Sequence, residues 1–197
     1  MIIRRDIVVI GASAGGVEAL KVLVSRLPSN LSAALLIVLH RHAPSPAILG
    51  DPLIEILEHV GKLPVCDARD GDPIVSGHIY LAPVDQHLLV YGDRMRLSSG
   101  AKLHWQRPSI DVLFLSAAAA FGPRVIGIIL SGYLNDGTAG LREVKGHGGI
   151  ALVQSPEDAL AKPMPLSAIQ HVAVDYVLPV ADMAEEIVRL VQQSAKH

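Results

Sequence analysis

The sequence predicts an α/β fold of three layers, in which helices cover both faces of a mostly parallel, doubly wound sheet. Short apolar runs of strand length alternate with segments whose apolar residues recur at helical spacing. The runs at residues 33–39 and 125–130 are continuously apolar, which is typical of strands buried on both faces. Of the 197 residues, 50% are hydrophobic and 18% are charged, so the chain has enough apolar material for a large core.

The first part of the chain is expected to form two strands and two helices. A strand at residues 6–10 runs into the glycine-rich turn GASAGG, and a buried strand follows at 33–39. A helix is expected at 46–59, although Gly50-Asp51-Pro52 interrupts its first half. A helix is expected between the two strands, and Pro28 ends it. Its apolar residues recur at helical spacing and are Val17, Leu20, Leu23, Val24 and Leu27.

The middle of the chain, residues 63–97, is richer in Pro, Gly and Asp and is expected to hold short strands and turns. The runs 79–82 and 88–91 flank the turn-forming residues 83–85. This pattern predicts a short antiparallel excursion around residues 78–97.

From residue 109 the alternation of helices and strands returns. Helices are expected at 111–121, 137–147 and 166–171, and strands at 125–130, 149–153 and 174–178. No repeat or linker interrupts the pattern, so residues 1–197 are expected to form a single domain. The last helix is expected to bury Met183, Ile187, Leu190 and Val191.

Composition excludes several classes of protein. The net charge is −2 and no basic run occurs, so nucleic-acid binding is not expected. The single cysteine, Cys66, excludes an internal disulfide and a multi-thiolate metal site. The apolar runs are too short to cross a bilayer and the amino terminus lacks a signal-peptide layout. We therefore expect a cytoplasmic protein that is not embedded in a membrane.

Three expected strands deliver polar side chains to one edge of the sheet. Ligands bind at the carboxyl ends of parallel strands, and these ends carry Ser13, His40 and Asp136. A serine hydroxyl needs a base to become nucleophilic, and a histidine base needs a carboxylate that fixes its tautomer. The set therefore predicts acyl transfer, with Ser13 as nucleophile.

The turn around Ser13 agrees with this interpretation. Residues 11–15, GASAG, match the G-x-S-x-G pattern of a tight strand-to-helix turn that exposes its serine. The first N–H groups of the following helix are unpaired and can bind an oxyanion.

Each candidate also has a plain structural interpretation. GASAGG can be a compact turn, His40 a satisfied histidine at a strand end, and Asp136 an N-cap of the next helix. Their joint position favours a function. His40 and His42 have no matching ligand motif, so no metal is expected. Cys66 is expected to be a structural thiol, and the histidines at 59, 78, 87, 104, 147, 171 and 197 are expected to be solvated.

Two standard folds fit poorly. A dinucleotide-binding turn needs G-x-G-x-x-G, and Ser13 occupies the place of its second glycine. An α/β-hydrolase carries its triad in the order Ser, Asp, His, whereas the order here is Ser, His, Asp.

Several blocks, in order, resemble the catalytic domain of the CheB-type chemotaxis protein-glutamate methylesterases. They are VVIGASAGGVEAL, VLHRHAP, GDPIVSGHIYLAP, QRPSIDVLFLSAA, IGIILSGYLNDGTAGL and PMPLSAI, which together cover nearly the whole chain. The resemblance implies a Ser13–His40–Asp136 triad, an oxyanion site near Ala14 and the backbone of Tyr133, and an RPSID loop beside the cleft. The family often has Thr at Ala14, Met-Gly at Tyr133-Leu134 and Gly at Pro163, which puts the fit of the substrate in question.

The resemblance further implies hydrolysis of glutamate γ-methyl esters on chemoreceptor-like helical proteins, without a cofactor. Deamidation of glutamine would use the same acyl-enzyme chemistry. The chain starts at its catalytic strand with no receiver domain before it, so control is expected either to come from a separate receiver or regulatory protein or to be missing. A helical substrate implies a shallow, open cleft. Two alternatives stay open: an esterase or amidase for another substrate, and a non-catalytic regulatory or partner module.

Overall fold

The main sheet has seven strands, and every neighbouring pair in it is parallel. The computed structural model describes residues 4–41 and 51–193. The strand order is β3-β4-β2-β1-β7-β8-β9. The expected α/β sheet is therefore confirmed. Its strands are β1 (Ile7–Ala12), β2 (Ala34–Leu39), β3 (Val65–Asp67), β4 (Ile79–Leu81), β7 (Val125–Ile129), β8 (Ile150–Gln154) and β9 (Tyr176–Leu178).

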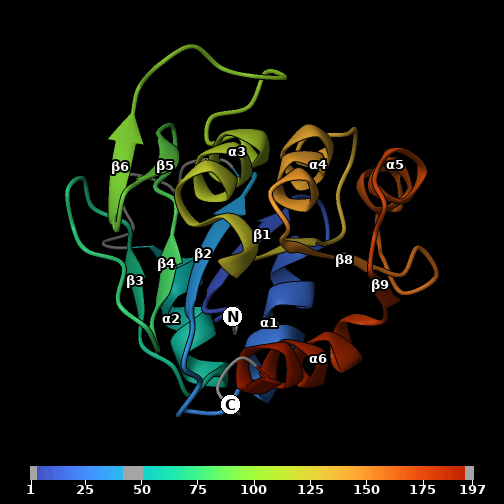
Figure 1. Cartoon of the computed structure of the whole chain (residues 1–197), viewed down its shortest axis with the longest axis horizontal. Coiled ribbons are helices and arrows are strands. Elements are labelled where there is room, and N and C mark those ends of the chain that lie inside the picture. Colours follow the sequence, from blue (N-terminus) through green and yellow to red (C-terminus); the bar gives the residue numbers. More distant parts are fainter. Residues whose placement is uncertain (1–3, 42–50, 194–197) are drawn as a thin grey trace.

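Helices cover both faces of this sheet, which gives the three expected layers (Figure 1). One face carries α1 (Gly16–Arg26), α2 (Pro52–Val60) and α6 (Val180–Gln193). The other face carries α3 (Ile110–Phe121), α4 (Thr138–Gly146) and α5 (Pro163–His171), and a single 3-10 turn, η1 (Gly122–Arg124), follows α3.

The central strands are apolar throughout because both of their faces are covered. Every residue of β1, β2 and β7 is buried. Side chains alternate between the faces, so Val8 and Ile10 enter the core under α1 and α6, whereas Ile7 and Val9 enter the core under α3 and α4. The continuous apolar runs in the sequence thus reflect a parallel sheet between two helical layers.

The antiparallel excursion exists, but its strands differ from the expected pair. We expected 79–82 to pair with 88–91, and this detail was wrong. Strand β4 lies in the parallel sheet between β2 and β3, where it is buried. The antiparallel pair is β5 (His87–Tyr91) with β6 (Arg94–Ser98), joined at Gly92. It packs one apolar face, with Leu88 and Met95, on the core near α3.

Helix α2 begins later than the sequence indicated. The side chain of Asp51 accepts a hydrogen bond from the Leu53 N–H at 3.0 Å, so Asp51 caps the helix and Pro52 occupies its first position. Residues 46–50 of the expected helix lie outside the described residues. Within the described ranges, no helix combines the length and the apolar character needed to cross a membrane.

The topology brings three chain segments to one edge. Strand β1 lies between β2 and β7, with Ala12 beside Leu39 and Gly11 beside Ile129. The turns that leave the carboxyl ends of these strands are therefore neighbours, although residues 13 and 136 are far apart in sequence.

Gly11 in β1 is expected to tolerate no side chain. A Cβ there would lie 2.9 and 3.0 Å from Cδ1 and Cγ1 of Ile110, and closer still to Cγ2. Gly11→Ala is therefore expected to lower the free energy of unfolding by about 1–3 kcal/mol, measured by denaturant titration. Gly146→Ala is the control, because nothing lies within 4 Å of a Cβ there. Equal stabilities of the two variants would contradict this packing.

Candidate active site

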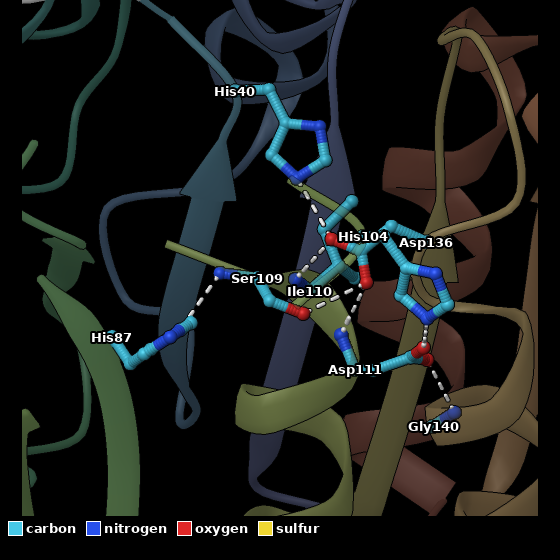
Figure 2. A network of polar contacts seen from close by, with 8 residues as sticks. All are labelled: His40, His87, His104, Ser109, Ile110, Asp111, Asp136 and Gly140. Atoms are coloured by element: carbon cyan, nitrogen blue, oxygen red, sulfur yellow. Dashed lines mark hydrogen bonds and ion pairs between the residues drawn. The ribbon is translucent and has the colours of Figure 1, made fainter. Parts of the chain in front are cut away.

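The carboxylate of Asp136 is buried and holds together two parts of the chain (Figure 2). His40 approaches from the end of β2, with Nε2 2.8 Å from Oδ2. The start of α3 binds the carboxylate from another side. The Ser109 hydroxyl and the Asp111 N–H donate to Oδ1 at 2.9 and 3.0 Å, and the Ile110 N–H donates to Oδ2 at 2.8 Å. The carboxylate thus occupies the positive end of a helix.

These donors decide the charge of Asp136. Burial by itself would raise the pKa of this carboxyl, but the hydrogen bonds from His40 and from the N–H groups of Asp111 and Ile110 outweigh it, and the pKa lies below its usual value. Asp136 is therefore ionised at neutral pH. An ionised carboxylate only accepts hydrogen bonds, so Nε2 of His40 carries the proton between them. Nδ1 of neutral His40 is then the nitrogen that can accept a proton.

Asp136 does not cap the helix that follows it, so that alternative is wrong. The N-cap of α4 is Gly137, which has no side chain to donate or accept. The Asp136 carboxylate instead binds the N-terminus of α3, a different helix.

Ser13 lies in the turn between β1 and α1, next to His40. The Ser13 N–H donates to the Ser131 carbonyl at 2.9 Å, which fixes the turn against the end of β7. The His40 N–H donates to the Ala12 carbonyl at 3.0 Å, which fixes the end of β2 beside the same turn. Ser13 and His40 line one cavity of about 660 Å³. The structure thus brings Ser13, His40 and Asp136 to the same edge.

The cavity is lined mainly by polar and charged side chains. Arg107 binds Asp85 from its Nε and Nη2 atoms at 3.0 and 2.8 Å, and Arg41 forms a bidentate pair with Asp51. The loop before α3 therefore has two roles: Lys102, Trp105, Gln106 and Arg107 border the cavity, and the last residue of the loop, Ser109, binds Asp136. The lining beyond Ser13 and His40 consists of Arg41, Val84, Asp85, Lys102, Trp105, Gln106 and Arg107.

Backbone N–H groups beside Ser13 are the candidates for binding an oxyanion. In the described part of the chain, the N–H groups of Ala14 and Tyr133 donate to no protein acceptor. The Gly132 N–H donates to the Ala161 carbonyl at 3.0 Å and is therefore occupied. A Cβ at Gly132 would lie 2.8 Å from Cβ of Ser13, so this residue must be small for the two loops to meet.

Ser131 is a site residue that the sequence analysis missed. Its hydroxyl donates to the Ala14 carbonyl at 2.7 Å and accepts from the Ala161 N–H at 2.8 Å. Its N–H donates to Oε1 of Gln154 at 2.8 Å. This buried serine therefore ties the Ser13 turn to the loops after β7 and β8. A serine directly after a buried strand was the only signal in the sequence.

His87 was expected to be solvated, and this expectation was wrong. The residue is 4% exposed, and both ring nitrogens have partners. Nδ1 accepts from the Ser109 N–H at 3.1 Å (Figure 2). Nε2 donates to the Ala101 carbonyl at 3.0 Å. His87 thus holds the loop before α3 at both of its ends and so fixes the helix N-terminus that binds Asp136. It is buried because β5 packs against α3.

Within the described residues, the other titratable side chains make no hydrogen bond to His40 or Asp136. His59, His147 and His171 are exposed, as expected, and His78 is partly buried, whereas His42 and His197 lie outside the described residues. Nε2 of His104 lies 3.6 Å from Oδ2 of Asp111. Burial raises the pKa of Asp111, against the hydrogen bond from the Gly140 N–H.

Cys66 lies in β3 and is partly buried, and burial raises the pKa of its thiol. A raised pKa keeps the thiol protonated and unreactive, which agrees with a structural role. Within residues 4–41 and 51–193, no three His, Cys, Asp or Glu side chains are grouped to hold a metal ion.

An α/β sheet that presents a serine, an imidazole and a buried carboxylate at its carboxyl edge has the side chains used in serine-dependent acyl transfer. The chain belongs to the CheB methylesterase family, whose model matches residues 8–187. The resemblance noted in the sequence is therefore confirmed.

Curated relatives and a solved structure agree with this membership. A putative protein-glutamate methylesterase/protein-glutamine glutaminase of Leptospira interrogans is 38% identical over 190 residues, which are 96% of each chain. The protein-glutamate methylesterase/protein-glutamine glutaminase of Hydrogenovibrio crunogenus is 35% identical, and the match covers 96% of this chain but 50% of that protein. The crystal structure of the Thermotoga maritima CheB methylesterase catalytic domain is similar with a TM-score of 0.88 and 33% identity, and the match covers 94% of this chain and 98% of that one.

Asp136→Asn is expected to destabilise the fold in a pH-dependent way. Because the pKa of Asp136 is lowered by folding, its stabilisation is complete above the unfolded value of about 3.9 and is lost as the pH falls through the folded value. At neutral pH the variant should lose about 1–3 kcal/mol of unfolding free energy, and the loss should shrink in acid. Denaturant titrations at several pH values measure it.

Asp93→Asn is the matched control, because the side chain of Asp93 is 86% exposed. It should leave stability unchanged at every pH. An equal loss for Asp136→Asn in acid and at neutral pH would show that the loss does not depend on the charge of Asp136.

Proposed function

We propose that this protein hydrolyses γ-methyl esters of glutamate side chains in proteins, with Ser13 as nucleophile, His40 as base and Asp136 as the group that orients His40. The observation that carries the proposal is the 2.8 Å contact between Nε2 of His40 and the ionised Asp136, at the rim of the cavity that Ser13 lines. The names of the relatives supply the substrate class.

The first half of the reaction forms an acyl-enzyme. Nδ1 of His40 takes the proton of the Ser13 hydroxyl while Oγ attacks the γ-carbonyl carbon of the ester. The resulting oxyanion is stabilised by the N–H groups of Ala14 and Tyr133. As the tetrahedral intermediate collapses, the bond between carbon and methoxy oxygen breaks. His40 returns the proton to that oxygen, and methanol leaves.

The second half repeats these steps with water. His40 deprotonates a water molecule, which attacks the acyl carbon, and Ser13 leaves as its hydroxyl. The product is a free glutamate side chain. In both halves the Asp136 carboxylate stabilises the protonated imidazole, and its own low pKa keeps it from taking the proton.

Deamidation of a glutamine side chain would follow the same path, with ammonia as the leaving group instead of methanol. The relatives named as protein-glutamine glutaminases support this second reaction. The substrate is a chemoreceptor-type helical protein. We further propose that residues 1–197 form one catalytic domain that acts in the cytoplasm without a cofactor.

Ser13→Ala is expected to lower the kcat for methanol release from methyl-esterified receptor protein by a factor on the order of a million. Ser25→Ala is the control, because Ser25 is exposed on α1. Among the described residues its hydroxyl bonds only to the Val22 carbonyl of the same helix, at 2.9 Å.

Three results separate the proposal from its alternatives. Substantial turnover by a folded Ser13→Ala protein would contradict the assigned nucleophile. Hydrolysis of other esters without receptor methyl esters would indicate an esterase for another substrate. A protein that neither releases methanol nor reacts at Ser13 with a serine-directed phosphonate would be a non-catalytic module.

A further inference from the structure

The most exposed large apolar side chains in the described residues gather at the edge that carries Ser13. Trp105 is 89% exposed, Leu160 81%, Leu134 64% and Tyr133 62%. We call these four residues the apolar rim. They come from the loops after β6, β7 and β8, and the first of these loops rises between β6 and α3 in Figure 1. Among the other described residues only Tyr91, at the β5–β6 turn, is as exposed, with 77%.

Contacts place the rim around the nucleophile. Trp105 lines the same cavity as Ser13 and His40. Gly132, whose Cβ would lie 2.8 Å from Cβ of Ser13, directly precedes Tyr133 and Leu134.

Leu160 lies close to the Ser13 turn at Gly15. A Cβ on Gly15, in the Ser13 turn, would lie 2.7 Å from Cβ of Leu160. Apolar side chains from three loops therefore flank one reactive serine.

Two rim residues hold a backbone conformation that L-amino acids avoid. Leu134 has φ +65° and Trp105 has φ +63°. Such a conformation costs on the order of 1 kcal/mol for a residue with a side chain. Burial of the side chain does not offset this cost, because both side chains are exposed. Contact with a bound molecule gives a reason for large apolar groups at these two positions.

The cavity also carries a cation without a partner. Arg41 is paired with Asp51 and Arg107 with Asp85. Lys102 lines the cavity, is exposed, and forms no ion pair or hydrogen bond within the described residues. A ligand that covers the cavity would therefore meet one uncompensated positive charge beside the apolar rim.

We propose that the apolar rim and Lys102 are specificity determinants: they favour an esterified glutamate that has bulky apolar neighbours and a second carboxylate within reach of Lys102. This inference rests on the proposed function, because it concerns the chain that surrounds the ester. The occupant is the substrate polypeptide itself, since Trp105 and Lys102 line the cavity at Ser13 and the other rim residues lie on loops that approach the Ser13 turn. A single methylene group buried in a hydrophobic pocket changes kcat/KM by about 10-fold to 200-fold.

The test compares two peptides that contain one glutamate γ-methyl ester and one free glutamate. Leucines flank the ester in the first peptide, and alanines replace them in the second. The native protein should hydrolyse the leucine peptide with a kcat/KM about 10-fold or more higher. Leu134→Gly and Trp105→Ala should each reduce this ratio severalfold. Lys102→Gln should lower kcat/KM for both peptides, but not for versions of them in which glutamine replaces the free glutamate.

Tyr91→Ala is the matched control, because Tyr91 is equally exposed but lies at the far turn of the β5–β6 pair. It should leave the ratio unchanged. Leu134→Gly should unfold at the same temperature as the native protein or higher, because glycine relieves the positive φ. A lower unfolding temperature would assign Leu134 a structural role and contradict the strain argument.

The outcomes separate the two levels of the proposal. Hydrolysis of both peptides with equal kcat/KM by the native protein would overturn the role of the rim and leave the proposed function intact. Hydrolysis of neither peptide, nor of esterified receptor, would overturn both. A ratio that Leu134→Gly, Trp105→Ala and Tyr91→Ala all leave unchanged would place the selectivity elsewhere.

Discussion

The site depends on the hydrogen bonds between the Asp136 carboxylate and the N-terminus of α3. Four donors from two chain segments converge on the two carboxylate oxygens, and they keep the carboxylate ionised although it is buried. A buried charge without such donors would be costly to the fold. The same hydrogen bonds orient the loop before α3, which His87 and Ser109 attach to β5, and this loop borders the cavity. Packing of the helix, ionisation of the carboxylate and the tautomer of His40 are therefore linked.

Much of the fold was predictable, because the strands of a sheet that is covered on both faces are continuously apolar in the sequence. The continuous apolar runs at 33–39 and 125–130 indicated central parallel strands, and both are central. The pairing of 79–82 could not be predicted in the same way. Three-residue strands carry no period that distinguishes a parallel partner far away from an antiparallel partner nearby. The start of α2 depended on the local cap at Asp51, which competes with an apolar pattern that begins earlier.

The candidate site was predictable as far as topology alone places residues. Ser13, His40 and Asp136 each follow a buried strand, so a parallel sheet brings them to one edge. Their supports were not predictable, because they depend on packing between elements. His87 is buried because β5 lies on α3, and three of the four donors to Asp136 come from the N-terminus of α3. The exposed rim follows no pattern either: the positive φ of Leu134 is visible only in the structure.

The tautomer of His40 tests the account most directly. Nitrogen-15 NMR of the histidine rings, in mildly alkaline solution and with Asp136→Asn and His40→Gln used for assignment, reports which ring nitrogen carries the proton. We expect the proton on Nε2, shared with Asp136, and an unprotonated Nδ1. Replacement of Asp136 by Asn should remove this preference. A proton on Nδ1 in the native protein, or a His40 spectrum that Asp136→Asn leaves unchanged, would contradict the assignment of carboxylate, imidazole and hydroxyl as one unit.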